Sequence, residues 1–185
     1  MKQTIDTYSD NELFTMLASR AQREAAFREL YRRFSQRVWA YCRTSLRNDE
    51  HAKDIVQDAF LRFYKSGEQG ANVVNVPAYL MRIVRNIVID EQRKMSLQFI
   101  SIEDLEIPDT EENTNQEEVE QLIETALQVL PEEYREALLM QTFSNMTYNE
   151  IAAVQEVPLS TVRNRIVRAK SRLREIVSVY FTNGE

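Results

Sequence analysis

The sequence has very little glycine and proline, with 3 glycines and 4 prolines among 185 residues. Sheet-rich folds need many tight turns, and glycine and proline are the residues that such turns most often require. Hydrophobic residues nevertheless make up 43% of the chain, which is enough for globular cores. We therefore predict an all-α fold of long helices with few breaks, divided into one ordinary domain or two small ones.

Cysteine and histidine are almost absent, since Cys42 and His51 are the single examples of each. One cysteine excludes an internal disulfide and is typical of a reducing compartment. Protein metal sites draw on several such ligands, so we expect no metal site. The sequence also lacks a glycine-rich phosphate loop and a nucleophile with a candidate base. We therefore expect no catalytic residue, no cofactor and no small-molecule substrate, and we do not expect an enzyme.

Long hydrophobic runs are missing as well. No run approaches the ~20 residues that a helix needs to cross a bilayer. Residues 1–10 are mostly polar and contain no apolar core of a signal peptide. We therefore expect a cytoplasmic protein without a membrane partner.

The net charge of −6 argues at first against nucleic-acid binding, but the distribution of charged residues along the chain favours it. Residues 1–95 hold 16 basic and 12 acidic side chains, whereas residues 96–126 hold 10 acidic side chains and no basic one. Residues 127–185 hold 7 of each sign, and six of these seven basic residues lie between Arg163 and Arg174. The pattern indicates a basic-leaning module, an acidic connector, and a module with one concentrated basic helix.

Apolar residues at helical spacing predict four helices in the first module, starting near Ser9, Glu24, Asp49 and Pro77. Residues 66–76 contain two of the three glycines and read as a loop. Residues 96–116 have no sustained period, and their acidic, polar composition predicts a flexible linker. The second module is expected to continue with one helix up to Pro131 and another over residues 132–143.

Residues 147–170 carry the most informative pattern, TYNEIAAVQEVPLSTVRNRIVRAK. Thr147 and Glu150 have the spacing of a capping box at the start of a short helix. Residues 156–158 form a tight break, and a second helix follows with Val162, Ile166 and Ala169 on its apolar face. Two short helices joined by such a turn predict a helix-turn-helix.

The second helix of this motif places polar and basic residues opposite its apolar face, because a helix advances about 100° per residue. An α-helix fits the DNA major groove, where arginine and asparagine pair with guanine and adenine edges and flanking cations contact phosphates. A solvated basic face is the simpler alternative. We predict DNA contacts from Ser160, Thr161, Arg163, Asn164, Arg165, Val167, Arg168 and Lys170.

The helix that starts at Pro77 also carries polar and basic residues on one side, and Ile89 lies among them. Such a face suits stacking against unpaired bases, although a solvated face explains it equally well. Tyr79, at the start of this helix, fits either a single-strand pocket or the core. The candidate DNA contacts here are Tyr79, Arg82, Arg85, Asn86 and Arg93.

Four segments in this order resemble the extracytoplasmic-function sigma factors, group 4 of the sigma-70 family. SDNELFTMLASRAQREAAFRELYRRFSQRVWAYC resembles the start of region 2, and DEHAKDIVQDAFLRFYK its core-binding helix. VPAYLMRIVRNIVIDEQRK resembles the helix that melts and reads the minus-ten element. LPEEYREALLMQTFSNMTYNEIAAVQEVPLSTVRNRIVRAKSRLR resembles region 4, which reads the minus-thirty-five element.

This resemblance implies a four-helix region 2 over residues 1–95, an acidic linker over 96–116, and a helix-turn-helix region 4 over 117–185. It implies core RNA polymerase, through the clamp helices of its largest subunit and its flap, and promoter DNA as partners. An anti-sigma factor is a further candidate partner. Asp54, Gln57 and Asp58 correspond to residues that face the clamp helices. Tyr79 stands where the family often has tryptophan, and Ser160 where it often has glycine, which affects the expected base preference or phosphate contact.

Two other classes of protein remain as alternatives. One is an autonomous helix-turn-helix regulator whose first module serves dimerisation or ligand binding, although two separate DNA surfaces disfavour it. The other is a helical adaptor that binds only protein, which the concentrated basic helix disfavours. The chain ends soon after the region that resembles region 4, so we expect no additional sensory domain.

Overall fold

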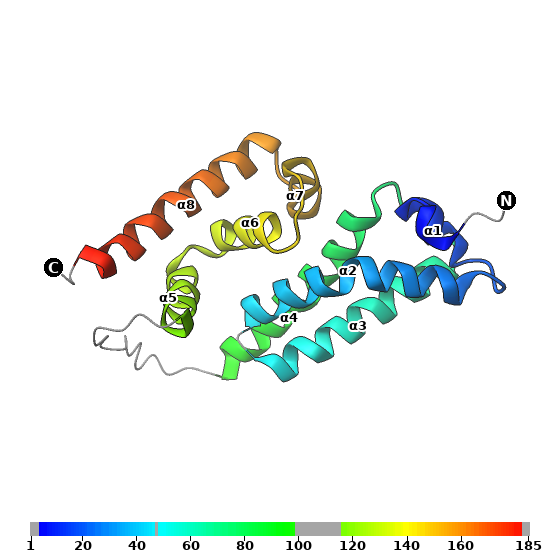
Figure 1. The fold of residues 1–185 in the computed structure, drawn as a ribbon, viewed down its shortest axis with the longest axis horizontal. Coiled ribbons are helices and arrows are strands. Elements are labelled where there is room, and N and C mark those ends of the chain that lie inside the picture. The colour runs from blue at the N-terminus through cyan, green and yellow to red at the C-terminus, as the bar shows by residue number, and fades with distance from the viewer. Residues whose placement is uncertain (1–3, 47, 99–115, 183–185) are drawn as a thin grey trace.

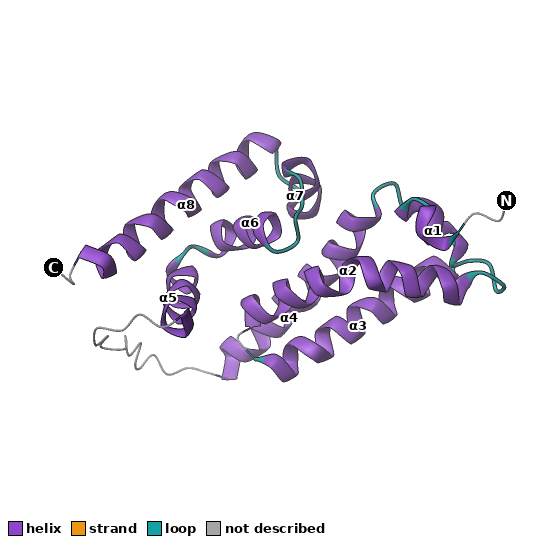
Figure 2. Cartoon of the chain, viewed as in Figure 1, coloured by secondary structure: helices purple, strands orange, loops and turns teal. Residues whose placement is uncertain are grey.

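The computed structural model describes residues 4–46, 48–98 and 116–182. Within these ranges the regular structure is entirely helical, as Figure 2 shows, so the prediction of an all-α fold is confirmed. A short 3-10 helix precedes eight α-helices: η1 (Ile5–Thr7), α1 (Asp10–Met16), α2 (Arg23–Leu46), α3 (Asp49–Glu68), α4 (Val76–Gln98), α5 (Gln116–Val129), α6 (Glu132–Thr142), α7 (Tyr148–Gln155) and α8 (Leu159–Thr182).

The helices form two groups, α1–α4 and α5–α8, as Figure 1 shows. In the first group α2, α3 and α4 pack on one another, and α1 closes one end. Large side chains such as Phe34, Tyr41, Phe63 and Leu80 are almost completely buried between these helices. Burial on this scale removes apolar surface from water and holds the helices together.

The predicted helix starts are confirmed where a cap specifies them. The Ser9 hydroxyl accepts a hydrogen bond from the backbone N–H of Glu12, and the backbone N–H of Ser9 donates to the Glu12 carboxylate, which completes the capping box of α1. Asn48 caps α3 by accepting from the backbone N–H groups of Glu50 and His51. These caps satisfy donors that the first helical turn leaves without partners.

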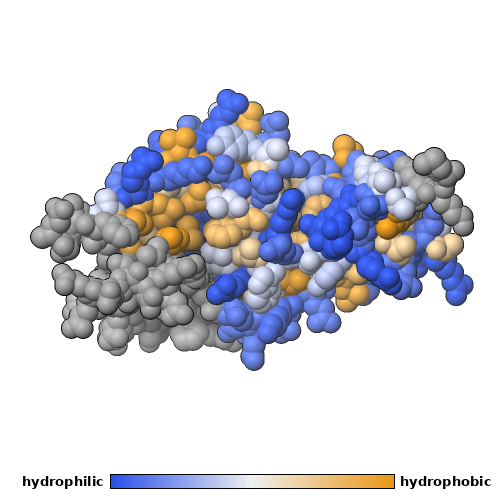
Figure 3. Space-filling view, in the orientation of Figure 1, coloured by the Kyte–Doolittle hydropathy of each residue, from blue (hydrophilic) through white to orange (hydrophobic). Residues whose placement is uncertain are grey.

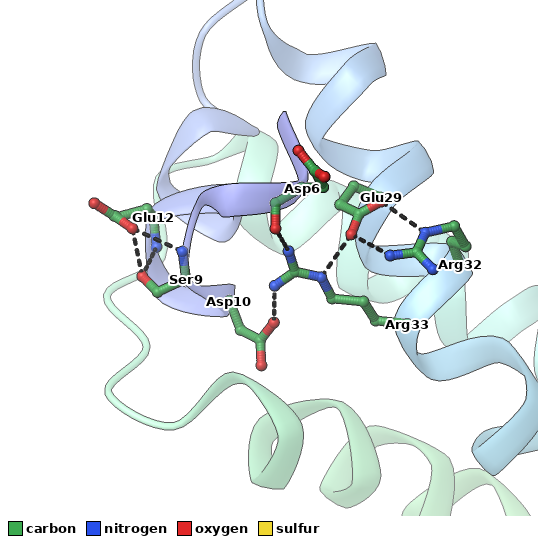
Figure 4. Close-up of polar contacts among 7 residues, drawn as sticks. All are labelled: Asp6, Ser9, Asp10, Glu12, Glu29, Arg32 and Arg33. Carbon is green, nitrogen blue, oxygen red and sulfur yellow. Dashed lines mark hydrogen bonds and ion pairs between the residues drawn. The ribbon is translucent and has the colours of Figure 1, made fainter. Parts of the chain in front are cut away.

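Arg33, which is held by the buried carboxylate of Glu29, ties the N-terminal segment to α2, as Figure 4 shows. Glu29 accepts hydrogen bonds from Arg32 and Arg33, and its side chain is only 7% exposed. Arg33 also donates to Asp10 at 2.7 Å and to the backbone carbonyl of Asp6 at 2.9 Å. The hydrogen bonds from Arg32 and Arg33 lower the pKa of Glu29 to about 2. The arginine pair thus keeps this carboxylate charged, and Arg33 links η1 and α1 to α2.

Two predicted boundaries are wrong. The loop expected over residues 66–76 begins later, because α3 continues through Gly67, where an added Cβ would lie 2.8 Å from the Cβ of Leu17. Glycine is used here for close approach of α1 rather than for a turn. Helix α4 also continues to Gln98, beyond the expected end near Lys94, and Met, Leu and Gln in this extension are good helix formers. Of the predicted linker, residues 99–115 lie outside the described residues, residues 96–98 belong to α4, and Gln116 begins α5.

The second group is built around α6, α7 and α8. Leu139, Met140, Ile151, Val162 and Ile166 are at most 1% exposed and form its centre. Figure 3 shows hydrophobic residues gathered between α8 and α6, whereas hydrophilic residues cover much of the remaining visible face. This core fixes the direction in which the outer side of α8 points.

The two groups also contact each other. Helix α7 packs against α4, and α6 packs against α2. The buried apolar side chains of both groups belong to one contiguous cluster. The contact between the groups is therefore part of the fold, and it bears directly on the residues expected to contact DNA.

Candidate nucleic-acid interface

The turn between α7 and α8 is set by Glu156, whose backbone is left-handed with φ +56°. The N–H groups of Glu156 and Val157 both donate to the carbonyl of Ala152, which ends α7. Three residues later, the N–H of Thr161 donates to the carbonyl of Pro158 at 2.9 Å and starts α8. Thr147 and Glu150 form the predicted capping box of α7. The local geometry is that of a helix-turn-helix.

Helix α8 has the two faces that its sequence predicts. Val162, Ile166 and Ala169 are buried against the rest of the second group. The outer side includes Val167, which is 65% exposed. An apolar group on a helix in the major groove can contact the methyl group of thymine. The predicted contacts that are exposed here are Ser160, Arg163, Asn164, Val167, Arg168 and Lys170, while Thr161 is half-buried.

Three arginines of α8 differ in how they are held. Arg168 donates to the Tyr134 hydroxyl at 3.2 Å, and Arg172 lies over the Tyr134 ring at 5.8 Å. Arg165 is half-buried and donates to the Gln155 side chain at 3.0 Å, so it points back toward α7. Arg163 and Arg168 therefore extend the exposed face, whereas Arg165 lies at its edge.

On α4 the predicted residues separate into an outer and an inner set. Arg82, Asn86 and Arg93 are exposed, and Ile89, expected among them as an exposed apolar residue, is half-buried. Tyr79 lies at the edge of the core, where its ring contacts Phe14 and Phe63. The Tyr79 and Ser66 hydroxyls share a hydrogen bond of 2.6 Å. This arrangement agrees with the core alternative for Tyr79, and a role in DNA contact remains a prediction.

Arg82 and Arg85 reach across to the second group of helices. Arg82 donates to the carbonyl of Ala153 at 2.6 Å, and Arg85 donates to the carboxylate of Glu136 at 2.5 Å. Gln155 donates to the other Glu136 oxygen at 2.8 Å. Sequence reasoning missed Glu136 and Gln155, because no local pattern marks a residue whose partner lies 51 positions away.

Beside this contact, a polar cleft of about 630 Å³ lies between the two groups. The Tyr41 hydroxyl donates to Glu136 at 3.4 Å, and burial, followed by the nearby Glu136 charge, raises the pKa of Tyr41 well above its ordinary value. Tyr41 therefore stays protonated and able to donate. Three helices thus direct donors at the single carboxylate of Glu136.

The residues expected to contact polymerase lie on one side of α3. Asp54 and Gln57 are exposed, and Asp58 is half-buried and held by Arg62 at 2.8 Å. Beside them a groove of about 740 Å³ runs between α2 and α3. Its lining includes Tyr31 and Leu61, which are 45% and 48% exposed and which sequence reasoning did not single out as site residues. Exposed apolar side chains beside polar ones are typical of a protein-binding surface.

The described residues hold no group of three or more histidine, cysteine, aspartate or glutamate side chains placed to bind a metal. Within the same ranges, no helix is both long and apolar enough to cross a membrane.

Comparison with known proteins identifies both helical groups. The model of Sigma-70 region 2 matches residues 30–97, and that of Sigma-70, region 4 matches residues 120–173. The RNA polymerase sigma-H factor of Pseudomonas aeruginosa is 26% identical over 173 residues, which are 85% of this chain and 90% of the relative. The ECF RNA polymerase sigma factor SigW of Bacillus subtilis is 25% identical over 166 residues, 81% of this chain and 88% of the relative.

Among solved structures, CnrH in complex with the cytosolic domain of CnrY has a TM-score of 0.67 at 21% identity, covering 92% of this chain and 97% of that one. The sigma factor RpoE of Bartonella quintana, in complex with the anti-sigma factor NepR, has a TM-score of 0.65 at 24% identity, covering 82% and 96%. These likenesses show that the fold is shared. With the two region models matching in order on the two helical groups, the chain belongs to the sigma-70 family, among its extracytoplasmic-function sigma factors.

Proposed function

We propose that this protein binds core RNA polymerase and directs transcription initiation at promoters whose minus-thirty-five element is read by α8. The observation that carries the proposal is the outer face of α8, where Arg163, Asn164 and Arg168 surround the exposed Val167 on a capped helix-turn-helix. These side chains supply donors for base edges and phosphates and an apolar contact for thymine.

The second part of the proposal concerns the minus-ten element and core polymerase. Arg82, Arg85, Asn86 and Arg93 on α4 would contact minus-ten DNA, with Tyr79 beside them. Asp54, Gln57 and Asp58 would face the clamp helices of the largest polymerase subunit, and the flap would contact the second group. The neighbouring groove between α2 and α3, with its exposed Tyr31 and Leu61, offers apolar area for the same partner.

Two further expectations follow from this role. A protein that works with polymerase and promoter DNA acts in the cytoplasm. An anti-sigma factor would regulate it, as the two solved relatives were captured with CnrY and with NepR.

The test is reconstitution with purified core RNA polymerase. The protein should co-elute with core enzyme on gel filtration, and the complex should transcribe selected promoters that core enzyme alone does not. A protein that binds promoter DNA specifically but never co-elutes with core enzyme would instead be an autonomous helix-turn-helix regulator. A protein that binds neither DNA nor core enzyme would contradict both readings.

A further inference from the structure

The carboxylate of Glu136 on α6 is the meeting point of the two helical groups. It accepts hydrogen bonds from the side chains of Arg85 of α4, Gln155 of α7 and Tyr41 of α2, with donor–acceptor distances of 2.5, 2.8 and 3.4 Å. Its side chain is 11% exposed, so few of these contacts are shared with water. A charge-assisted bond from arginine is the strongest of the three, and the two others hold the carboxylate in place for it.

The same contact occupies side chains that the proposed function needs elsewhere. Arg85 is held by Glu136, and Arg82 is held by the Ala153 carbonyl of α7. On the opposite side, Arg165 of α8 bonds to Gln155, which itself bonds to Glu136. A guanidinium N–H that donates to a carboxylate is not available to a phosphate or a base at the same time. One N–H group of each of these arginines, which come from both proposed DNA surfaces, is therefore engaged by another part of the protein.

The packing of the helices adds to the effect of these hydrogen bonds. Helix α7, the first helix of the helix-turn-helix, packs directly on α4, the helix proposed to read the minus-ten element. Arg85 is partly covered at this contact, with 27% of its side chain exposed, whereas Arg82 stays exposed and is engaged through its hydrogen bond to Ala153. The contact thus withholds Arg85 by position and by hydrogen bonding, and Arg82 by its hydrogen bond.

The contact is nevertheless partly accessible to solvent. Arg85 is 27% exposed, and the cleft of about 630 Å³ beside it admits solvent between the groups. DNA phosphates match an arginine fork as well as a carboxylate does, so a nucleic acid held near by core polymerase competes with Glu136 for the same donors.

We propose that the contact of α4 with α6 and α7 is an autoinhibitory latch, centred on Glu136, that keeps Arg82 and Arg85 from DNA until the protein joins core polymerase. The inference rests on the proposed function for its meaning, because it assumes that α4 contacts promoter DNA. The latch itself is a physical contact that can be measured without polymerase or DNA.

The test compares Glu136→Gln with Glu133→Gln in the full chain. Both variants remove one negative charge from α6 beside the same cleft, but Glu133 is exposed, and only Glu136 holds Arg85 in the described contacts. Spin labels on exposed positions of α3 and α8, introduced as Lys65→Cys and Glu175→Cys, report the separation of the groups by pulsed electron resonance. Cys42 stays unlabelled, since it is fully buried and burial raises its pKa to about 12.

The free protein with Glu133→Gln should keep the single distance distribution of the parent chain, while Glu136→Gln should broaden it toward longer distances. Affinity of the free protein for a minus-ten promoter fragment should rise with Glu136→Gln alone, by about tenfold if one molecule in ten is open beforehand. Equal distributions in all three proteins, or opening without a gain in DNA affinity, would overturn the latch.

A charge swap separates a lost latch from a damaged fold. Glu136→Arg should open the protein because two arginines then face each other, and the double variant Arg85→Glu with Glu136→Arg should restore the closed distance. Failure of the double variant to close would count against a latch held by this pair. The proposed function has a separate readout, because the parent protein must co-elute with core enzyme whether or not the latch exists.

Discussion

Gly67 of α3 lies directly beneath Leu17 at the end of α1. A Cβ at position 67 would stand 2.4 Å from the Leu17 Cδ1 and 2.8 Å from its Cβ, closer than side-chain carbons approach in proteins. Leu17 is fully buried, so it has no free space into which to move. Packing of α1 against α3 therefore depends on the missing side chain at this position.

Gly67→Ala should lower the free energy of unfolding by about 1–3 kcal/mol, the usual cost of overfilling a packed core. Thermal or urea unfolding followed by circular dichroism measures the change. Lys65→Ala, an exposed position on the same helix, is the control and should change stability by no more than about 0.5 kcal/mol. A fully stable Gly67→Ala protein would mean that α1 packs less tightly than described.

Arg168→Ala should weaken binding to the minus-thirty-five element by about 1–3 kcal/mol, the size of a bidentate base contact. Arg168 is exposed on the outer face of α8, and its one described bond, to the Tyr134 hydroxyl, is at the surface. Transcription in vitro from a promoter with this element, beside a matched template without it, measures the effect. An equal loss on both templates would make Arg168 a phosphate contact only.

Asp54→Lys should reduce affinity for core polymerase at least several-fold without unfolding the protein. Asp54 is exposed on α3 beside the groove with Tyr31 and Leu61, on the side of the helix that we propose faces polymerase. Titration of labelled protein with core enzyme measures affinity, and Glu133→Lys on α6 serves as a control of equal charge change. Unchanged binding by Asp54→Lys would remove this side of α3 from the polymerase contact.

Because of Glu29, the free energy of unfolding should depend on pH in the acidic range. Its folded pKa of about 2 lies below the ordinary value of 4.5, because Arg32 and Arg33 stabilise its charged form. This stabilisation is fully present above pH 4.5 and is lost as the pH falls toward 2. Glu29→Gln should therefore lower stability at pH 7 by about 1.5–3 kcal/mol, the range for hydrogen bonds to charged groups.

Urea unfolding at several pH values tests this expectation. The parent protein should lose stability between pH 4.5 and 2 more steeply than Glu29→Gln does. The control is Glu24 on the same helix, whose side chain is 88% exposed. The Glu24→Gln variant should behave like the parent protein. Parallel curves for the parent protein and Glu29→Gln would show that the carboxylate contributes nothing through its charge.

The sequence alone determined that the fold is helical, where the two capping boxes lie, and which faces α8 presents. Both capping boxes, Ser9 with Glu12 and Thr147 with Glu150, are present as predicted. Periodicity placed Val162 inside and Arg168 outside correctly. These features are readable because helical periodicity and capping act between residues at most a few positions apart.

Only the tertiary structure decided which residues meet across the two helical groups. Arg85 looked on sequence like a free basic side chain, and its position against Glu136 depends on how α4 and α6 pack. Gly67 read as part of a loop because the reason for a glycine there, the side chain of Leu17, lies 50 residues away. Hydrogen bonding and steric contact act through space, so a one-dimensional pattern cannot show partners that folding brings together from distant parts of the chain.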